Sequence, residues 1–228
     1  VGGVIVGILT TYQYTANTMS VRLVYSRNGK TWEHLNKRQP FLAPRGEGTW
    51  DAYMVTIPSK PVEVGDELYV FHGGSRNHHD WWITGAREGL PVPEATDTRC
   101  VEYDLGLARL RLDGFASLDA GPARRGILIT RPVISDGTRL VVNARCNGGG
   151  AIAAEVVDIH DHVLPGFGRE ECDVFTGDDV RHIFSWQGRE ELPAVTDDRA
   201  EYPHPEIERF RKVRFFMEKA ELYTFTLA

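Results

Sequence analysis

Apolar and polar residues alternate in short runs along much of the chain, and turn-forming residues separate these runs. Val213, Phe215 and Met217 alternate with charged residues, which is the pattern of a strand with one face buried. Similar runs predict strands at residues 2–14, 21–26, 52–57, 67–72, 105–112, 127–131, 140–144, 153–158, 180–186, 213–217 and 222–227. Short strands separated by turns predict an all-β protein, built as a sandwich, a barrel or a propeller.

Turn and loop signals divide this pattern. Asn28 and Gly29 predict a two-residue type I′ hairpin turn, because both residue types tolerate a positive φ. Residues 75–99 and 187–211 are polar, contain proline, and form long interruptions of the kind that often carries function. Within the second interruption we expect a short helix at residues 206–212.

Small, polar and turn-forming residues at 114–125 predict a domain boundary, which gives domains at 1–115 and 116–228. The chain starts with the apolar sequence VGGVIVGILTTYQY, which has no basic n-region and is typical of a buried strand rather than a signal peptide. We therefore expect further sequence upstream. The compartment is not fixed by these residues, and a secreted or periplasmic location is favoured over a cytoplasmic one.

Composition excludes several classes of protein. The net charge is −6, which argues against a non-specific nucleic-acid binder, because such proteins present a basic face. No apolar run approaches the roughly 20 residues that span a bilayer, so we expect no membrane association. Nucleotide-binding glycine motifs and the GxSxG motif of serine hydrolases are absent, and the sequence predicts no cofactor.

The chain has three cysteines, Cys100, Cys146 and Cys172, at wide spacings that exclude a zinc ribbon. A disulfide between Cys146 and Cys172 is one interpretation. Three buried free thiols are favoured, because cysteine usually behaves as a small buried apolar residue.

The first candidate site is the sequence GEGTWD at residues 46–51. Glu47 and Asp51 flank Trp50 on a turn that leads into a predicted strand. A tryptophan ring offers a stacking surface to the apolar face of a sugar, and a carboxylate accepts hydrogen bonds from its hydroxyl groups. The competing interpretation, a turn cap at Asp51 and a core tryptophan, is slightly favoured because Asp and Gly are common turn residues.

The second candidate site is the sequence HGGSRNHHDWW at residues 72–82. Strand alternation places Leu68, Val70 and His72 on one face and Tyr69 and Phe71 on the other. Polar groups beside indole rings suit a sugar subsite, although a solvated loop and, less favoured, a metal site remain alternatives. The candidate side chains are His72, Arg76, His78, His79, Asp80, Trp81 and Trp82.

The sequence DIHDH at residues 158–162 contains residue types that bind metals. It lies between two predicted strands, where a turn is expected, and Asp and His are tolerated in turns. A turn is therefore the preferred interpretation, and no metal site is predicted.

Several phrases resemble a bacterial family of glycoside-hydrolase-like proteins with a five-bladed β-propeller, of the furanosidase-clan type (families 32, 43 and 68), and a C-terminal β-sandwich. The phrases occur in the expected order: YSRNGKTW (25–32), GTWDAYM (48–54), PVEVGDELYVFHGG (61–74), LGLARLRLDGFASLDAG (105–121), LVVNA (140–144), PGF (165–167) and AELYTF (220–225). SRNGKTW also resembles the Asp-box hairpin of sialidase propellers, with Asn28 in place of Asp.

The resemblance implies that residues 1–115 are the terminal blade or blades of a propeller and that residues 116–228 are a jelly-roll-like sandwich. The catalytic acids of that clan lie on early blades, which this chain lacks. We therefore expect part of a glycosidase that contributes a sugar subsite wall, with an oligo- or polysaccharide as its partner. The alternatives are a non-catalytic carbohydrate-binding module and a structural piece that forms oligomers through an exposed propeller edge.

Overall fold

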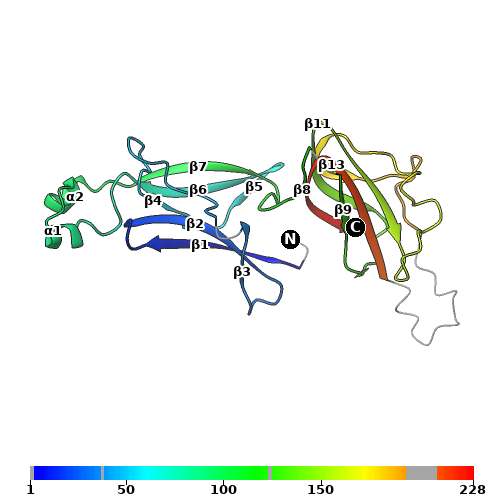
Figure 1. The fold of residues 1–228 in the computed structure, drawn as a ribbon, viewed down its shortest axis with the longest axis horizontal. Helices are drawn as coiled ribbons and strands as arrows, with labels where there is room; N and C mark the ends of the chain where they lie inside the picture. The colour runs from blue at the N-terminus through cyan, green and yellow to red at the C-terminus, as the bar shows by residue number, and fades with distance from the viewer. Residues whose placement is uncertain (1–2, 37–38, 123–124, 194–209) are drawn as a thin grey trace. The chain divides into compact units, whose positions relative to one another are not determined.

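The computed structural model describes residues 3–36, 39–122, 125–193 and 210–228, most of which lie in or between β-strands (Figure 1). The prediction of an all-β protein is confirmed at this level. The chain divides into two compact units, an N-terminal unit of residues 3–116 and a C-terminal unit of residues 117–228. No helix in the described ranges is long and apolar enough to cross a membrane.

The N-terminal unit is built on one seven-stranded sheet with the main strand order β1-β2-β4-β6, in which β3 also pairs with β2, and β5 and β7 also pair with β6. Pairing is antiparallel except between β2 and β4, which run parallel at Met19 and Met54. Its strands are β1 (Ile5–Gln13), β2 (Thr18–Ser26), β3 (Glu33–His34), β4 (Met54–Thr56), β5 (Val62–Val64), β6 (Glu67–Ser75) and β7 (Asp104–Arg111).

The core of this unit follows the expected strand alternation. Leu68, Val70 and His72 of β6 are buried, whereas Phe71 is 47% exposed, so the predicted division of faces is confirmed. Val21 and Val55, on the neighbouring strands β2 and β4, are fully buried. Branched side chains on one face of a sheet pack closely, and here they leave the opposite face of β6 to solvent.

The long loop predicted at 75–99 contains local structure that the sequence analysis did not expect. It includes two short helices, α1 (Thr84–Glu88) and α2 (Pro93–Thr96), and the 3₁₀ turn η2 (Thr98–Cys100). Pro93 starts α2 because its fixed φ suits the first turn of a helix, and Gly89 ends α1 with a φ of 68°. Figure 1 shows both helices together at one end of the N-terminal unit.

The prediction of a type I′ turn at Asn28 and Gly29 is wrong. Gly29 has a φ of 70°, but Asn28 is not among the residues with positive φ, so the mirror-image turn does not form. Instead, Ser26 Oγ accepts hydrogen bonds from the amides of Asn28 and Gly29, and Asn28 Oδ1 accepts from the amides of Lys30 and Thr31. Side-chain acceptors therefore set the turn that leads from β2 to β3.

The C-terminal unit has a six-stranded, antiparallel sheet system in which β13 is central. The path is β10-β13-β11-β12, and β8 and β9 also pair with β13. Its strands are β8 (Leu118–Ala120), β9 (Gly126–Ile129), β10 (Val133–Ile134), β11 (Leu140–Val157), β12 (Asp178–Ile183) and β13 (Phe210–Leu227).

Two pairs of predicted strands are single long strands. Residues 140–144 and 153–158 belong to β11, and 213–217 and 222–227 belong to β13. The pairing of β11 with β13 shifts between Cys146 and Ala151, where the four residues 147–150 face the single residue Lys219. A Cβ on Gly150 would lie 2.2 Å from the carbonyl oxygen of Lys219, so only glycine fits this irregularity.

Both halves of the long strands contribute to one core. Leu140 and Val142 come from the first half of β11, Ile152 and Val156 from the second, and all belong to the same buried cluster. Trp186 is 1% exposed in this cluster, and its Nε1–H donates to the carbonyl oxygen of Ala154 at 3.1 Å. A buried indole whose donor is satisfied adds apolar area without the cost of an unpaired polar group.

The short helix predicted at 206–212 is wrong where it can be compared with the structure, because residues 210–212 begin β13. Residues 206–209, and residues 194–205 of the same interruption, lie outside the described residues. All three cysteines are free thiols, but only Cys172 is buried; Cys100 and Cys146 are partly exposed.

Candidate functional site

Asp51 is fixed by an arginine that the sequence analysis did not single out. The Arg45 Nε–H donates to both carboxylate oxygens of Asp51, at 2.8 and 2.9 Å. Asp51 is only 4% exposed, whereas the Arg45 side chain remains 56% exposed. The carboxylate is therefore a buried counter-ion, and the exposed member of the pair is the guanidinium of Arg45.

Trp50 lies flat over the sheet beside this pair. Its ring stacks on His72 with the ring centroids 5.6 Å apart and an angle of 28° between the planes. A Cβ on Gly74 or Gly106 would meet the Trp50 ring at 2.6 or 2.8 Å, so these two glycines of β6 and β7 make room for it. Trp50 stays partly exposed, with the guanidinium carbon of Arg45 5.7 Å from its ring centroid.

Glu47 is an exposed carboxylate three residues before Trp50 in the chain. It accepts a hydrogen bond from the hydroxyl group of Tyr53 at 3.2 Å. Burial and the contact with Glu47 both raise the pKa of Tyr53, so its phenol stays protonated and keeps this hydrogen bond at neutral pH.

His78 and Glu94 form a buried pair at the centre of the second candidate segment. His78 Nδ1 lies 2.7 Å from Glu94 Oε1, and the same oxygen accepts from the His78 amide at 3.0 Å. Asn77 Nδ2–H donates to the other oxygen at 3.4 Å. Burial alone would raise the pKa of Glu94, but the hydrogen bonds from His78 and Asn77 outweigh it and the pKa is lowered.

The His78 ring is also enclosed by aromatic rings. Tyr53 stacks on it with centroids 3.7 Å apart, and Trp81 stacks on it with centroids 3.5 Å apart. These contacts hold the loop to Tyr53, the residue directly before β4, with the His78 ring buried between the other two. Tyr53 joins the two candidate segments, because it contacts both Glu47 and His78.

His79 and Asp80 attach the loop to the turn between β1 and β2. Asp80 Oδ1 accepts hydrogen bonds from the side chains of Asn17 and Tyr12, and the Asp80 amide donates to Asn17 Oδ1 at 2.9 Å. The His79 ring packs on Tyr12 with centroids 4.7 Å apart. Both predicted site residues are thus engaged in loop attachment.

Arg76 and Trp82 are the predicted residues of this segment that remain exposed. Arg76 lies 3.3 Å from the Glu102 carboxylate, and both side chains are more than half exposed. Trp82 is 42% exposed. The predicted set therefore divides by exposure. The exposed members are Glu47, Arg76 and Trp82, the partly exposed ones are Trp50, His79, Asp80 and Trp81, and the buried ones are Asp51, His72 and His78.

The residues with metal-binding potential do not form a metal site. Within the ranges that the structure describes, no group of three or more His, Cys, Asp or Glu side chains could hold an ion. Residues 158–162 form the expected turn, in which Asp158 Oδ1 accepts from the amides of His160 and His162. Asp161, with a φ of 70°, completes it.

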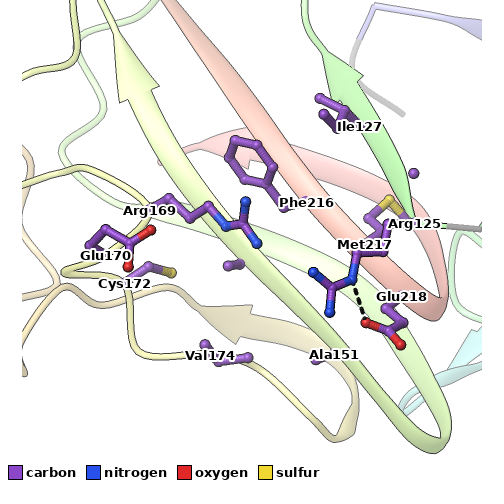
Figure 2. A pocket seen from close by; sticks show the side chains of 12 residues that line it. Arg125, Ile127, Ala151, Arg169, Glu170, Cys172, Val174, Phe216, Met217 and Glu218 are labelled. Atoms are coloured by element: carbon purple, nitrogen blue, oxygen red, sulfur yellow. Dashed lines mark hydrogen bonds and ion pairs between the residues drawn. The ribbon is translucent and has the colours of Figure 1, made fainter.

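A separate pocket of about 390 Å³ lies in the C-terminal unit (Figure 2). None of its residues was predicted as a site. The lining residues are Arg125, Gly126, Ile127, Ala151, Ala153, Arg169, Glu170, Cys172, Val174, Phe216, Met217 and Glu218. They come from β9, β11, β13 and the loop before residue 175, so no local sequence signal unites them.

Comparisons with protein-family models, with curated proteins and with solved structures find no match for this chain. The resemblance to propeller-bearing glycoside hydrolases therefore stays a prediction, and the site has to be interpreted from its own geometry.

Proposed function

We propose that this chain is the carbohydrate-binding, non-catalytic part of a larger carbohydrate-active protein. The observation that carries the proposal is the placement of Trp50. Its partly exposed ring is fixed against His72 and the glycine backbone, beside the exposed guanidinium of Arg45. A rigid aromatic surface beside a fixed hydrogen-bond donor suits a sugar ring, which has an apolar face and hydroxyl groups at its edge.

The arrangement of carboxylates favours binding over hydrolysis by this chain alone. Glycoside hydrolysis needs two carboxyl groups on either side of the scissile bond. Asp51 is paired with Arg45, and Glu94 is buried against His78. Glu47, three residues before Trp50 in the chain, is an exposed carboxylate held by Tyr53. A catalytic pair would have to come from elsewhere in a longer protein.

We also propose that the N-terminal unit is the terminal part of a β-propeller and that the C-terminal unit is a β-sandwich. Support for the first comes from the antiparallel order β4-β6-β7 and from apolar residues on the outer face of β6 and β7, namely Phe71, Leu105 and Leu107. A neighbouring blade would cover such a face. Support for the second comes from the bent β11–β13 pair, whose halves share one core.

The test is glycan-array binding followed by titration calorimetry with the best ligand. We expect Trp50→Ala to weaken binding by about tenfold or more, since loss of one aromatic platform costs on the order of 1.5 kcal/mol. The matched control is Trp32→Ala, which removes another exposed tryptophan of the same unit, 44% exposed, outside the candidate site.

Two results would overturn the proposal. One is equal loss of binding in both tryptophan variants. The other is turnover of glycosides by this chain that disappears in Glu47→Gln, because that would make Glu47 a catalytic residue. Turnover that appears only when natural upstream sequence is joined to the chain would instead support the glycosidase assignment for the longer protein.

A further inference from the structure

We propose that the pocket in the C-terminal unit is a second carbohydrate site, which takes a neutral pyranose unit. The inference rests on the proposed function for the class of ligand, but it concerns other residues in the other unit. It starts from the way the strands place their side chains.

Three paired strands form the floor of the pocket. Phe216 of β13 lies opposite Ile127 of β9 and Ala153 of β11, and Glu218 lies opposite Ala151. Directly paired residues of neighbouring strands share one face of the sheet, so these side chains form one surface. Because Ala151 and Ala153 are small, a hollow remains beside the larger Phe216 and Glu218.

The segment from Arg169 to Val174 forms the wall of this hollow. It is fixed to β11, because the amide of Ala154 donates to Cys172 Sγ at 3.2 Å and residues Ile152 and Phe175 pair as a bridge. Figure 2 shows Arg169 extending from this wall over the strands, while Cys172 and Val174 lie on the same side of the hollow. Strand pairing therefore holds the floor of the pocket, and the contacts of Cys172 and Phe175 with β11 hold its wall.

Charged groups of both signs line the pocket in equal number. The Arg125 Nε–H donates to Glu218 at 3.0 Å, and the guanidinium carbon of Arg169 lies 4.5 Å from the Phe216 ring centroid. Glu170 is the second carboxylate in the lining. Guanidinium groups only donate hydrogen bonds and carboxylates only accept them, so the pocket offers both functions without net charge.

This balance selects the ligand class. A sugar hydroxyl donates and accepts at once, so a pair of neighbouring hydroxyl groups matches an Arg–Glu pair. The CH face of the ring can pack on the apolar floor. An anionic ligand gains no net attraction and has to lose its hydration, which makes it the poorer occupant. The volume of 390 Å³ lies at the lower end of small-molecule sites, which suits one or two rings.

Nuclear magnetic resonance titration of the ¹⁵N-labelled chain is the direct test. The neutral probes are methyl β-D-galactopyranoside and methyl α-D-glucopyranoside, and D-glucuronate is the charged analogue. We expect saturable shifts at the amides of Gly126, Ala151 and Cys172 with at least one neutral probe. Glucuronate is expected to bind at least about tenfold more weakly, equivalent to 1.4 kcal/mol.

Two variants separate the pocket from general effects. Ala151→Leu fills the hollow without removing a hydrogen-bonding group, and Glu218→Gln removes one acceptor charge. Each is expected to raise the dissociation constant of the neutral probe at least about tenfold. The matched control is Asp178→Asn, since Asp178 pairs with Arg145 at 3.0 Å, is similarly exposed and does not line the pocket. This control variant should bind the neutral probe with the same dissociation constant as the unmodified chain.

Repeating the titration in Trp50→Ala distinguishes this inference from the proposed function. Pocket shifts that persist there support the inference. Shifts confined to residues around Trp50 in the unmodified chain would overturn the inference and leave the proposed function standing. Shifts at the pocket in the unmodified chain, with no shifts around Trp50, would support the inference and overturn the proposed function. Preferential binding of glucuronate, or no pocket shift with either neutral probe, would also overturn the inference.

Discussion

At the residue scale, the buried charged groups of the candidate segments are paired with one another. Asp51 and Glu94 are both buried, and each is offset by a specific partner, Arg45 and His78. A buried carboxylate without such a partner would cost several kcal/mol or become protonated. Removing Glu94 is therefore expected to disturb the loop at residues 76–82 before it disturbs Arg45 or Trp50.

Glu94→Gln is the sharpest test at this scale. Because folding lowers the Glu94 pKa, the charged form stabilises the fold above the ordinary Glu value of 4.5 and this contribution is lost as pH falls through the folded-state pKa. We expect the variant to lose about 1–3 kcal/mol at pH 7. The difference from the unmodified chain should shrink below pH 4.5.

Amide hydrogen exchange at His78 and Glu102, measured at pH 7 and during acid titration, reports this difference. Glu88→Gln is the matched control, because Glu88 is an exposed glutamate on α1. A difference between Glu94→Gln and the unmodified chain that stays constant down to pH 3 would contradict the assignment.

At the scale of elements, the glycine run 148–150 determines the course of β11. Two of the three glycines are required, each for a different reason, and the third is not. Gly149 adopts a φ of 75°, Gly150 lies against the backbone of Glu218 and Lys219, and Gly148 has no neighbour within 4 Å of an added Cβ. Across the ladder, Lys219 has a φ of 46° and switches the buried residues of β13 from 213, 215 and 217 to 220 and 222.

Gly150→Ala is expected to destabilise the C-terminal unit by about 3 kcal/mol, because the backbone atoms it would meet cannot move as a side chain does. Gly148→Ala offers the matched control and should change the free energy of unfolding by less than about 0.5 kcal/mol. Urea unfolding followed by the nuclear magnetic resonance amide signals of Ile152 and Phe215, which are buried in the C-terminal unit, measures both. Equal effects of the two substitutions would show that the glycine run is a flexible turn rather than a fixed bend.

At the scale of the whole molecule, the described part of the N-terminal sheet ends in two strands, β1 and β7, that each pair on one side only. Leu105 and Leu107 of β7 are 81% and 47% exposed. An unpaired strand edge beside exposed apolar side chains favours association with another chain. Leu105 and Leu107 also lie on the face that the proposed neighbouring blade would cover.

Sedimentation velocity over a range of concentrations tests this expectation. The unmodified chain should show a mass that rises with concentration, and Leu107→Lys should reduce the rise because a charge on an edge strand opposes pairing. The control is Ile83→Lys, which alters a residue that is 44% exposed before α1 and away from β7. A clean monomer at all concentrations would contradict the role of this edge.

The sequence determined the elements whose signals are local. Apolar runs located the longer strands of both units but missed the short strands β3, β5, β8 and β10. Alternation in β6 placed His72 on the buried face, and the polar composition of 158–162 indicated a turn. Each depends on residues two to five positions apart, where the backbone geometry of a strand or turn fixes the relation between side chains.

Only the tertiary structure decided how these elements combine. The joining of two predicted strands into β11, and of two more into β13, depends on a change of alternation at Lys219 and on the fit of Gly150 to the facing strand. The partner of His78, which is Glu94, and the lining of the pocket likewise come from other segments of the chain. Such contacts are set by packing between elements, whose energies depend on the three-dimensional fit of side chains and leave no pattern in the local sequence.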